Sequence, residues 1–115
     1  MRAVIQRVKN AWITVDGGPK QEMGAGLVVL FGVREGDVPE DTLAIANKIS
    51  QLRIFEDSDG KMNVGPLELG MDCMVVSQFT LFADTKKGRR PSFVKAARPE
   101  VATPIYEKFL AEMQA

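Results

Sequence analysis

The run Leu27–Val33 (LVVLFGV) constrains the fold of this chain more than any other stretch, because it is apolar on both sides of an extended backbone. A strand with one face in water alternates apolar and polar residues, whereas a strand covered on both faces does not. Gly24-Ala25-Gly26 breaks the chain before this run, and the loop Arg34–Asp37 follows it. We therefore expect a central strand, with the rest of the chain arranged as a sheet around it.

Shorter strands are expected on either side of this run. They are marked by alternating apolar and polar residues, by β-branched residues and by Asp/Gly turns. The expected strands are 2–9, a hairpin of 12–15 with 20–23, a hairpin of 53–55 with 61–63, and a strand from Cys73 through Phe82. The segment 65–70 is expected to be a loop, and 92–97 a short strand or an extended segment.

Two amphipathic helices are expected. The first runs from Pro39 to about Leu52, with Asp37 as N-cap. The second begins at Pro104 with Thr103 as N-cap, because a proline in a helix interior clashes with the preceding turn. The apolar stripes of the two helices have the helical period, and they consist of Leu43, Ala46, Ile49 and Leu52, then Ile105, Phe109, Leu110 and Met113.

Length and element order predict the architecture. A chain of 115 residues is enough for one domain and one core. Short, turn-rich links between strands favour antiparallel pairing. We expect one α+β domain over residues 1–115, made of a curled, largely antiparallel and barrel-like sheet with two helices packed on it.

Composition excludes several classes of function. Lys+Arg and Asp+Glu both number 15, so the net charge is zero and any RNA contact must come from a local patch; DNA is not an expected partner. The chain has no histidine, which removes Ser-His and Cys-His catalysis. The single cysteine, Cys73, suits a reducing cytoplasm and is expected to be a small buried hydrophobe. Neither a signal peptide nor a membrane-spanning run is expected.

No metal or cofactor is expected. The carboxylates of Glu56, Asp57 and Asp59 resemble the start of a calcium loop, but the remaining ligands and the closing Glu of an EF-hand are lacking. A solvated turn is the preferred interpretation of this segment.

The stretch from Met71 to Phe93 carries the chemistry. The apolar run Cys73–Val76 passes into Ser77, Gln78 and Thr80 before returning to Leu81 and Phe82. A buried polar group costs roughly 1–3 kcal/mol when it is left unpaired. These polar side chains are therefore either satisfied by neighbouring backbone or used in a site.

A cationic loop follows directly. Lys86, Lys87, Arg89 and Arg90 accompany one acidic residue, Asp84. Runs of charge are often only solvated loops. Beside a polar strand end, they also suit a phosphate-bearing ligand.

The same residues resemble the D-aminoacyl-tRNA deacylase family, also called D-tyrosyl-tRNA deacylase. The resemblance rests first on the block Ser77-Gln78-Phe79-Thr80-Leu81. It extends over the whole chain, through Ile5–Val8, Gly24–Leu27, Arg53–Phe55, Gly60–Asn63, Ala83–Thr85, Gly88 and Arg90–Phe93.

The resemblance implies a homodimeric editing enzyme that hydrolyses the ester between a D-amino acid, or glycine, and the terminal adenosine of a mischarged tRNA. By resemblance, Ser77, Gln78, Phe79 and Thr80 line the aminoacyl-adenosine pocket, with Leu81 beside them. Backbone amides near Phe79 and Thr80 would form the oxyanion hole, and the tRNA 2′-hydroxyl would assist hydrolysis. Arg7 would help to fix the pocket from the dimer side.

Physical chemistry bears on the role of Thr80. An activated ester needs no strong nucleophile when oriented amides stabilise the developing oxyanion. A threonine nucleophile needs a base, and none is present in the motif. We therefore expect Thr80 to position the substrate.

Members of the family continue beyond the position of Ala115 with an Asn-x-Gly-Pro-x-Thr segment, whose Gly-cis-Pro enters the partner's pocket and excludes L-amino acids. Neither Gly18-Pro19 nor Gly65-Pro66 fits that role. The resemblance thus predicts either a shortened or a divergent member. Two alternatives to an editing esterase remain open: a module that binds tRNA or protein without turnover, and a fragment without a function of its own.

Overall fold

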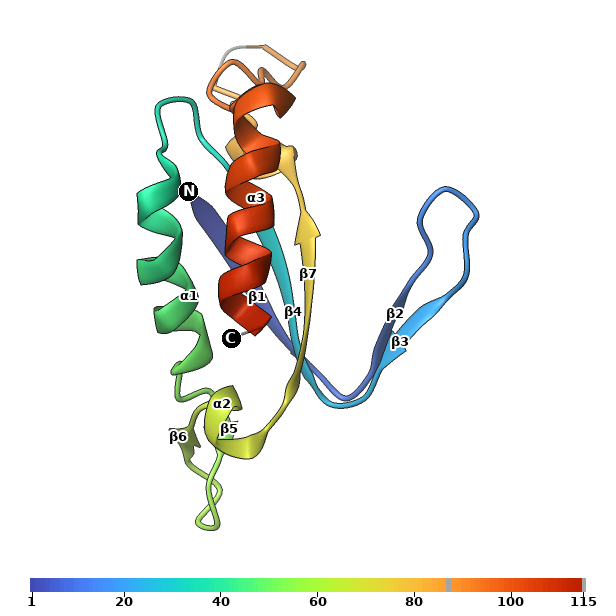
Figure 1. Cartoon of the computed structure of the whole chain (residues 1–115), viewed down its shortest axis with the longest axis vertical. Coiled ribbons are helices and arrows are strands. Elements are labelled where there is room, and N and C mark those ends of the chain that lie inside the picture. The colour runs from blue at the N-terminus through green and yellow to red at the C-terminus, as the bar shows by residue number, and fades with distance from the viewer. Residues whose placement is uncertain (87, 115) are drawn as a thin grey trace.

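The computed structural model describes residues 1–86 and 88–114. Helices α1 (Thr42–Ser50) and α3 (Pro99–Gln114) lie side by side on one face of a three-stranded sheet (Figure 1). The strand order in this sheet is β1 (Arg2–Val8), β4 (Gly26–Gly32) and β7 (Asp72–Ser77). The predicted single α+β domain and the central position of the apolar run are confirmed.

Two small hairpins accompany the main sheet. Strands β2 (Ala11–Ile13) and β3 (Gln21–Met23) form an arm that projects from the body, and β5 (Phe55–Glu56) pairs with β6 (Met62–Val64) (Figure 1). The three sheets are separate, and β1 and β7 form the two edges of the main one within the described residues. The sheets therefore do not close into the barrel that the sequence suggested.

The pairing of β7 differs from the antiparallel arrangement that short links predict. Of the four strand ladders in the described part of the chain, three are antiparallel, but β4 and β7 run parallel, with Phe31 opposite Ser77. A parallel pair needs a long crossover, and the segment from 33 to 71, which contains α1, provides it. This crossover brings the start of β1 and the ends of β4 and β7 to the same end of the sheet.

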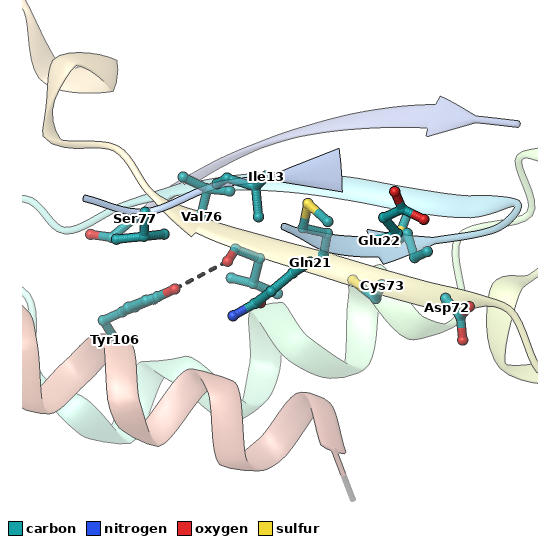
Figure 2. A pocket seen from close by; sticks show the side chains of 12 residues that line it. Ile13, Gln21, Glu22, Asp72, Cys73, Val76, Ser77 and Tyr106 are labelled. Carbon is teal, nitrogen blue, oxygen red and sulfur yellow. Dashed lines mark hydrogen bonds between the residues drawn. The ribbon is translucent and has the colours of Figure 1, made fainter. Parts of the chain in front are cut away.

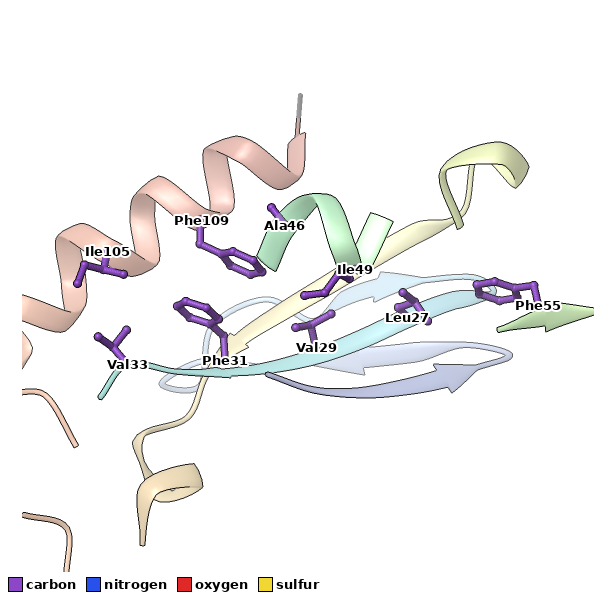
Figure 3. Close-up of a cluster of buried hydrophobic side chains, with 9 residues drawn as sticks. All are labelled: Leu27, Val29, Phe31, Val33, Ala46, Ile49, Phe55, Ile105 and Phe109. Carbon is purple, nitrogen blue, oxygen red and sulfur yellow. The ribbon is translucent and has the colours of Figure 1, made fainter. Parts of the chain in front are cut away.

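The core lies between the main sheet and the two helices (Figure 3). Leu27, Val29 and Phe31 alternate along β4 and are almost completely buried beneath the helices. The ring of Phe31 stacks on that of Phe109 from α3, with centroids 4.2 Å apart and an interplanar angle of 3°. Burying each such side chain contributes about 1.5–3 kcal/mol, so this face supplies most of the stability.

Among the described residues, no helix covers the opposite face of the main sheet (Figure 1). Apolar residues from all three strands face this side and stay partly or largely exposed, namely Val4, Val28, Leu30, Met74 and Val76. The expectation that Leu27–Val33 is covered on both sides is thus fulfilled on the helix side only. We call these five residues the open sheet face.

Helix α1 is shorter than predicted and begins differently. A 3-10 turn, η1 (Pro39–Asp41), precedes it, and the capping role predicted for Asp37 is wrong. The Asp37 carboxylate instead accepts the Arg34 amide at 2.7 Å and pairs with the amino terminus. Of the predicted stripe, Ala46 and Ile49 are buried, whereas Leu43 is exposed.

Helix α3 begins five residues earlier than predicted, at Pro99 rather than Pro104. Pro99 occupies the first turn, where a missing N–H costs nothing, and the Arg98 carbonyl accepts the amides of Val101 and Ala102. Pro104 lies inside the helix, and the stripe residues Ile105 and Phe109 are fully buried. Their packing outweighs the hydrogen bond that Pro104 cannot make.

Three smaller expectations also change. The loop 65–70 contains a short helix, α2 (Pro66–Leu69), and 92–97 makes isolated bridges instead of a strand. Cys73 is exposed, because β7 is an edge strand; partial desolvation still raises the pKa of its thiol. Within the described residues, no helix combines the length and hydropathy needed to cross a membrane.

Candidate active site

The block Ser77–Leu81 forms a turn and not the interior of a buried strand. Strand β7 ends at Ser77, the Gln78 amide makes a last ladder bond to the Phe31 carbonyl at 2.7 Å, and the 3-10 turn η2 (Phe79–Phe82) follows. Ser77, Phe79 and Thr80 are exposed. The predicted strand through Phe82 is therefore wrong, because its partner β4 ends at Gly32 and offers no further ladder.

Gly32 allows the turn to pack against the end of β4. A Cβ atom at this position would lie 3.0 Å from the Gln78 carbonyl oxygen and 3.2 Å from both the Leu81 Cβ and the Phe82 Cε2. Phe82 is buried and anchors the far end of the turn. The main chain of Gln78–Phe82 thus approaches Gly32 so closely that a larger residue there would have to displace the turn by a few tenths of an ångström.

Two backbone donors of this turn have no acceptor within the described part of the chain. The Leu81 amide bonds to the Gln78 carbonyl at 3.3 Å and the Ala83 amide to the Thr80 carbonyl at 3.0 Å. The amides of Phe79 and Thr80 precede the first of these bonds, and neither has a hydrogen-bond acceptor among residues 1–86 and 88–114. Adjacent free N–H groups on a fixed turn are suited to bind an oxyanion.

The polar side chains of the turn bind each other. The Gln78 side-chain amide donates to the Thr80 hydroxyl oxygen. No carboxylate or lysine within the described residues accepts a proton from this hydroxyl, and the chain has no histidine. The contacts favour a positioning role for Thr80 and leave it without a base that would make it a nucleophile.

A cavity of about 780 Å³ lies between this turn and the start of α3. Ser77, Phe79 and Phe93 line one side, and Tyr106 and Leu110 line the other. The Phe79 and Phe93 rings meet edge to face with centroids 5.1 Å apart and an angle of 67°. The lining is mainly apolar with a few polar groups, which is the usual make-up of a small-molecule site; we call it the aromatic cavity.

A second cavity, of about 650 Å³, lies between β7 and the β2–β3 arm (Figure 2). Gln21 and Glu22 of the arm line it together with Asp72 and Cys73 of β7. Tyr106 lines both cavities, and its hydroxyl donates to the Val75 carbonyl at 3.1 Å. Desolvation raises the pKa of Tyr106, so this phenol stays neutral and fixes α3 to β7.

Arg7 lies away from the turn within one chain. It pairs with Leu27 in the register, whereas Ser77 pairs with Phe31, so the two positions are separated by four residues of β4, or about 13 Å. The Arg7 guanidinium donates to the Ile54 carbonyl at 2.8 Å. A contribution of Arg7 to the site can come only from a second subunit.

The predicted cationic loop is closed at its base by two bonds between Asp84 and Ser92, each of 2.7 Å. Arg89 and Arg90 are exposed, and Lys86 lines a small cavity near the turn. Lys87 lies outside the described residues. Leu81 is half-buried, and its carbonyl accepts a hydrogen bond from Arg2.

Sequence reasoning missed the aromatic partner Tyr106 and three cations, Arg2, Arg34 and Lys95, which share the small cavity with Lys86. These residues are far apart along the chain. The β1–β4 ladder and the Arg34–Ala96 bridge bring the three cations together, and the parallel β4–β7 pairing brings the η2 turn to the same end of the sheet. Phe93 belonged to the block that carried the family resemblance, which is the one signal that pointed to it.

The Asp57 turn is closed by its own backbone. The Asp57 carboxylate accepts the amides of Lys61 and Asp59 at 3.0 and 2.9 Å, and these bonds lower its pKa. Across the described chain, no group of three or more His, Cys, Asp or Glu residues is placed to hold a metal ion.

These features define a class: single α+β domains with a cavity beside a polar turn at the end of a mixed sheet. The sequence profile of the D-Tyr-tRNA(Tyr) deacylase family matches residues 4–115. The chain belongs to this family.

Individual relatives agree with the assignment. The chain is 54% identical over 115 residues to a D-aminoacyl-tRNA deacylase of Chloroflexus aurantiacus, covering all of this chain and 72% of that protein. It is 50% identical over 113 residues to one of Parabacteroides distasonis, covering 98% and 75%.

Solved structures share the fold. One described as c-Myc DNA Unwinding Element Binding Protein superposes with a TM-score of 0.90 at 36% identity, covering 99% of this chain and 76% of that chain. A probable eukaryotic D-amino acid tRNA deacylase gives a TM-score of 0.83 at 18% identity, covering 97% and 66%. At that identity the second likeness concerns the fold alone.

Proposed function

We propose that this protein hydrolyses the ester bond of D-aminoacyl-tRNA, and of glycyl-tRNA mischarged on tRNA-Ala, releasing the free amino acid and tRNA. Membership of the deacylase family supports an ester hydrolase that acts on D-aminoacyl-tRNA. The observation that carries the mechanism is the pair of unpaired amides at Phe79 and Thr80, on a fixed turn next to the aromatic cavity.

The proposed reaction needs no catalytic side chain. Water adds to the ester carbonyl carbon, and the negative charge that develops on the carbonyl oxygen accepts hydrogen bonds from the Phe79 and Thr80 amides. One such donor contributes about 3–4 kcal/mol to the transition state. The bond to the ribose oxygen then breaks, that oxygen takes up a proton, and the neighbouring ribose hydroxyl holds the attacking water in place.

The side chains have supporting roles in this scheme. Gln78 and Thr80, joined by their hydrogen bond, hold the turn and contact the terminal adenosine. Ser77 and the ring of Phe79 form the wall of the cavity beside the scissile bond. Lys86, Arg89 and Arg90, with Lys87, contact tRNA phosphates, and Leu81 supports the adenosine end.

We further propose a cytoplasmic homodimer. The open sheet face is an apolar surface built by three strands, and an apolar surface of this kind favours association. A second subunit would also offer its own Arg7 to the site. Light scattering coupled to size exclusion tests this proposal, and a monomer at micromolar concentration would contradict it.

Incubation with D-tyrosyl-tRNA and with L-tyrosyl-tRNA tests the function. Loss of the D-ester alone would support editing, and loss of both esters would indicate hydrolysis without chiral selection. If neither ester is lost while tRNA is still bound, the chain is a binding module and the proposed reaction is wrong. Hydrolysis is followed by release of radiolabelled amino acid, with buffer alone as the reference.

A further inference from the structure

The small cavity beside the η2 turn gathers positive charge from four separate segments. Arg2, Arg34, Lys86 and Lys95 line it, together with Phe82 and a single carboxylate, that of Asp84. Its volume of about 320 Å³ is at the lower end of the range of small-ligand sites. We call it the basic cavity.

The backbone fixes the position of each of these cations. Arg2 opens β1 and pairs with Gly32, and Arg34 pairs with Ala96 in an isolated bridge. Lys95 lies next to this bridge, and its carbonyl accepts the Glu35 amide at 2.9 Å. The Lys86 amide is bonded to the Asp84 carboxylate at 2.9 Å. The main chain at each of the four cations is therefore held by strand, bridge or turn hydrogen bonds.

The positive charge in the cavity is poorly compensated. The Asp84 carboxylate approaches Lys95 only to 3.8 Å, and its other oxygen is bonded to the Lys86 backbone. Arg2 donates to a neutral carbonyl, that of Leu81, and its guanidinium lies 4.7 Å from the centre of the Phe82 ring. Among the described residues, Arg34 and Lys86 make no ion pair through their side chains.

The cavity is joined directly to the candidate active site. The Leu81 carbonyl that accepts from Arg2 belongs to the residue after Thr80, and Phe82 belongs to both the turn and the cavity wall. The proposed ester site and the basic cavity therefore lie on the same turn. Guanidinium and ammonium groups that line one cavity are suited to the oxygens of a phosphate.

We propose that the basic cavity binds a backbone phosphate of the tRNA acceptor end, so that Arg2, Arg34 and Lys95 act with Lys86 as a phosphate site. This inference rests on the proposed function. To the contacts expected from the exposed loop it adds cations from the start of β1 and from the Arg34–Ala96 bridge. The site would increase affinity for any tRNA ester without selecting its amino acid, since a phosphate carries no information about the residue attached.

The double variant Arg34→Gln/Lys95→Gln tests this site. The matched control is Lys48→Gln/Lys61→Gln, which removes the same charge at exposed positions outside the cavity. Binding of deacylated tRNA is measured between 50 and 200 mM salt, about the range over which phosphate binding shows its salt dependence. We expect affinity to fall about tenfold at low salt, and the salt slope to decrease by about 0.7–0.9 for each phosphate that the variant no longer neutralises, while the control variant changes little.

A phosphate-free substrate separates this inference from the proposed function. Wild-type protein and the Arg34→Gln/Lys95→Gln variant are assayed on D-tyrosyl-tRNA and on D-tyrosyl adenosine, which carries the ester without any phosphate. The KM for D-tyrosyl-tRNA divided by the KM for D-tyrosyl adenosine should be about tenfold higher in the Arg34→Gln/Lys95→Gln variant than in wild-type protein. If wild-type protein hydrolyses neither compound, the proposed function fails; if it hydrolyses both and the ratio is unchanged in the variant, the phosphate site fails.

Inorganic phosphate and the single variant Lys86→Gln complete the test. Phosphate in the millimolar range should compete with tRNA for wild-type protein and much less for the double variant. Phosphate binding without competition would show that the cavity serves a free anion, which overturns the tRNA assignment. Should the double variant unfold, Lys86→Gln, an exposed loop change, gives a second measure of the same salt slope.

Discussion

The helix-covered core and the η2 turn lie at opposite extremes of packing, although both depend on β4. Leu27, Val29 and Phe31 are buried within strand ladders on both sides. Just past the end of this strand, the chain supports an exposed turn with two free amides. The core stabilises the fold, and the end of the same strand positions the chemistry, so changes at the two places should separate stability from activity.

The largest effect is expected in the core. Phe109→Ala removes the ring stacked on Phe31 and should lower the free energy of unfolding by about 3–5 kcal/mol. Urea denaturation followed by the fluorescence of the single Trp measures this loss. Val101→Ala, an exposed change on the same helix, should stay within about 0.5 kcal/mol. A similar loss from both variants would mean that α3 is not packed through Phe109.

Gly32→Ala should affect the turn more than the core. The added methyl would press on the Gln78 carbonyl and on Leu81 and Phe82, costing about 1–3 kcal/mol of stability. Because that pressure moves the amides of the turn, we expect deacylation to fall by a hundredfold or more in protein that is still folded at 25 °C.

The matched control for Gly32 is Gly24→Ala, where an added methyl meets no atom within 4 Å. Thermal melting and initial rates on D-tyrosyl-tRNA are compared for both variants. Full activity in folded Gly32→Ala protein would show that the exact placement of the turn is unimportant for the reaction.

Tyr106 connects the two regions, and Tyr106→Phe should cost about 0.5–1.5 kcal/mol by removing its bond to the Val75 carbonyl. Burial raises the pKa of this phenol above the ordinary value near 10. Its contribution to stability is therefore complete below pH 10 and is lost as the pH rises through the raised pKa. The phenylalanine variant should lack this alkaline loss.

The alkaline prediction is readily measured because Tyr106 is the single tyrosine of the chain. In an alkaline pH titration, the absorbance of tyrosinate reports Tyr106 alone. The free energies of unfolding of wild-type and Tyr106→Phe protein are compared over the same pH range. A midpoint at or below 10 in folded protein would contradict the desolvated position of the ring.

The smallest effect on the rate is expected at Thr80. Thr80→Ala removes the hydroxyl that accepts from Gln78 but leaves the Thr80 amide in place. Deacylation should decrease by no more than about tenfold, the equivalent of ~1.4 kcal/mol. Single-turnover rates on D-tyrosyl-tRNA measure it, and a fall to the uncatalysed rate would point to a hydroxyl nucleophile.

Short-range patterns predicted the elements that local chemistry controls. The unbroken apolar run indicated the central strand, the period of Ile105 and Phe109 indicated the core face of the last helix, and the Asp/Gly turns indicated both hairpins. The Ser77–Leu81 block indicated a site that stays a prediction, whereas the predicted strand through it was wrong.

Most of the strands and helices, and the family to which the motif belongs, can be read from the order of residues alone, because periodicity and turn residues act within a few positions of the chain. Folding in three dimensions was needed to establish the parallel pairing of β4 with β7, the start of α3 at Pro99, and the meeting of Arg2, Arg34 and Lys95 beside the turn. These features depend on contacts between residues that are far apart in sequence, where packing outweighs local preference.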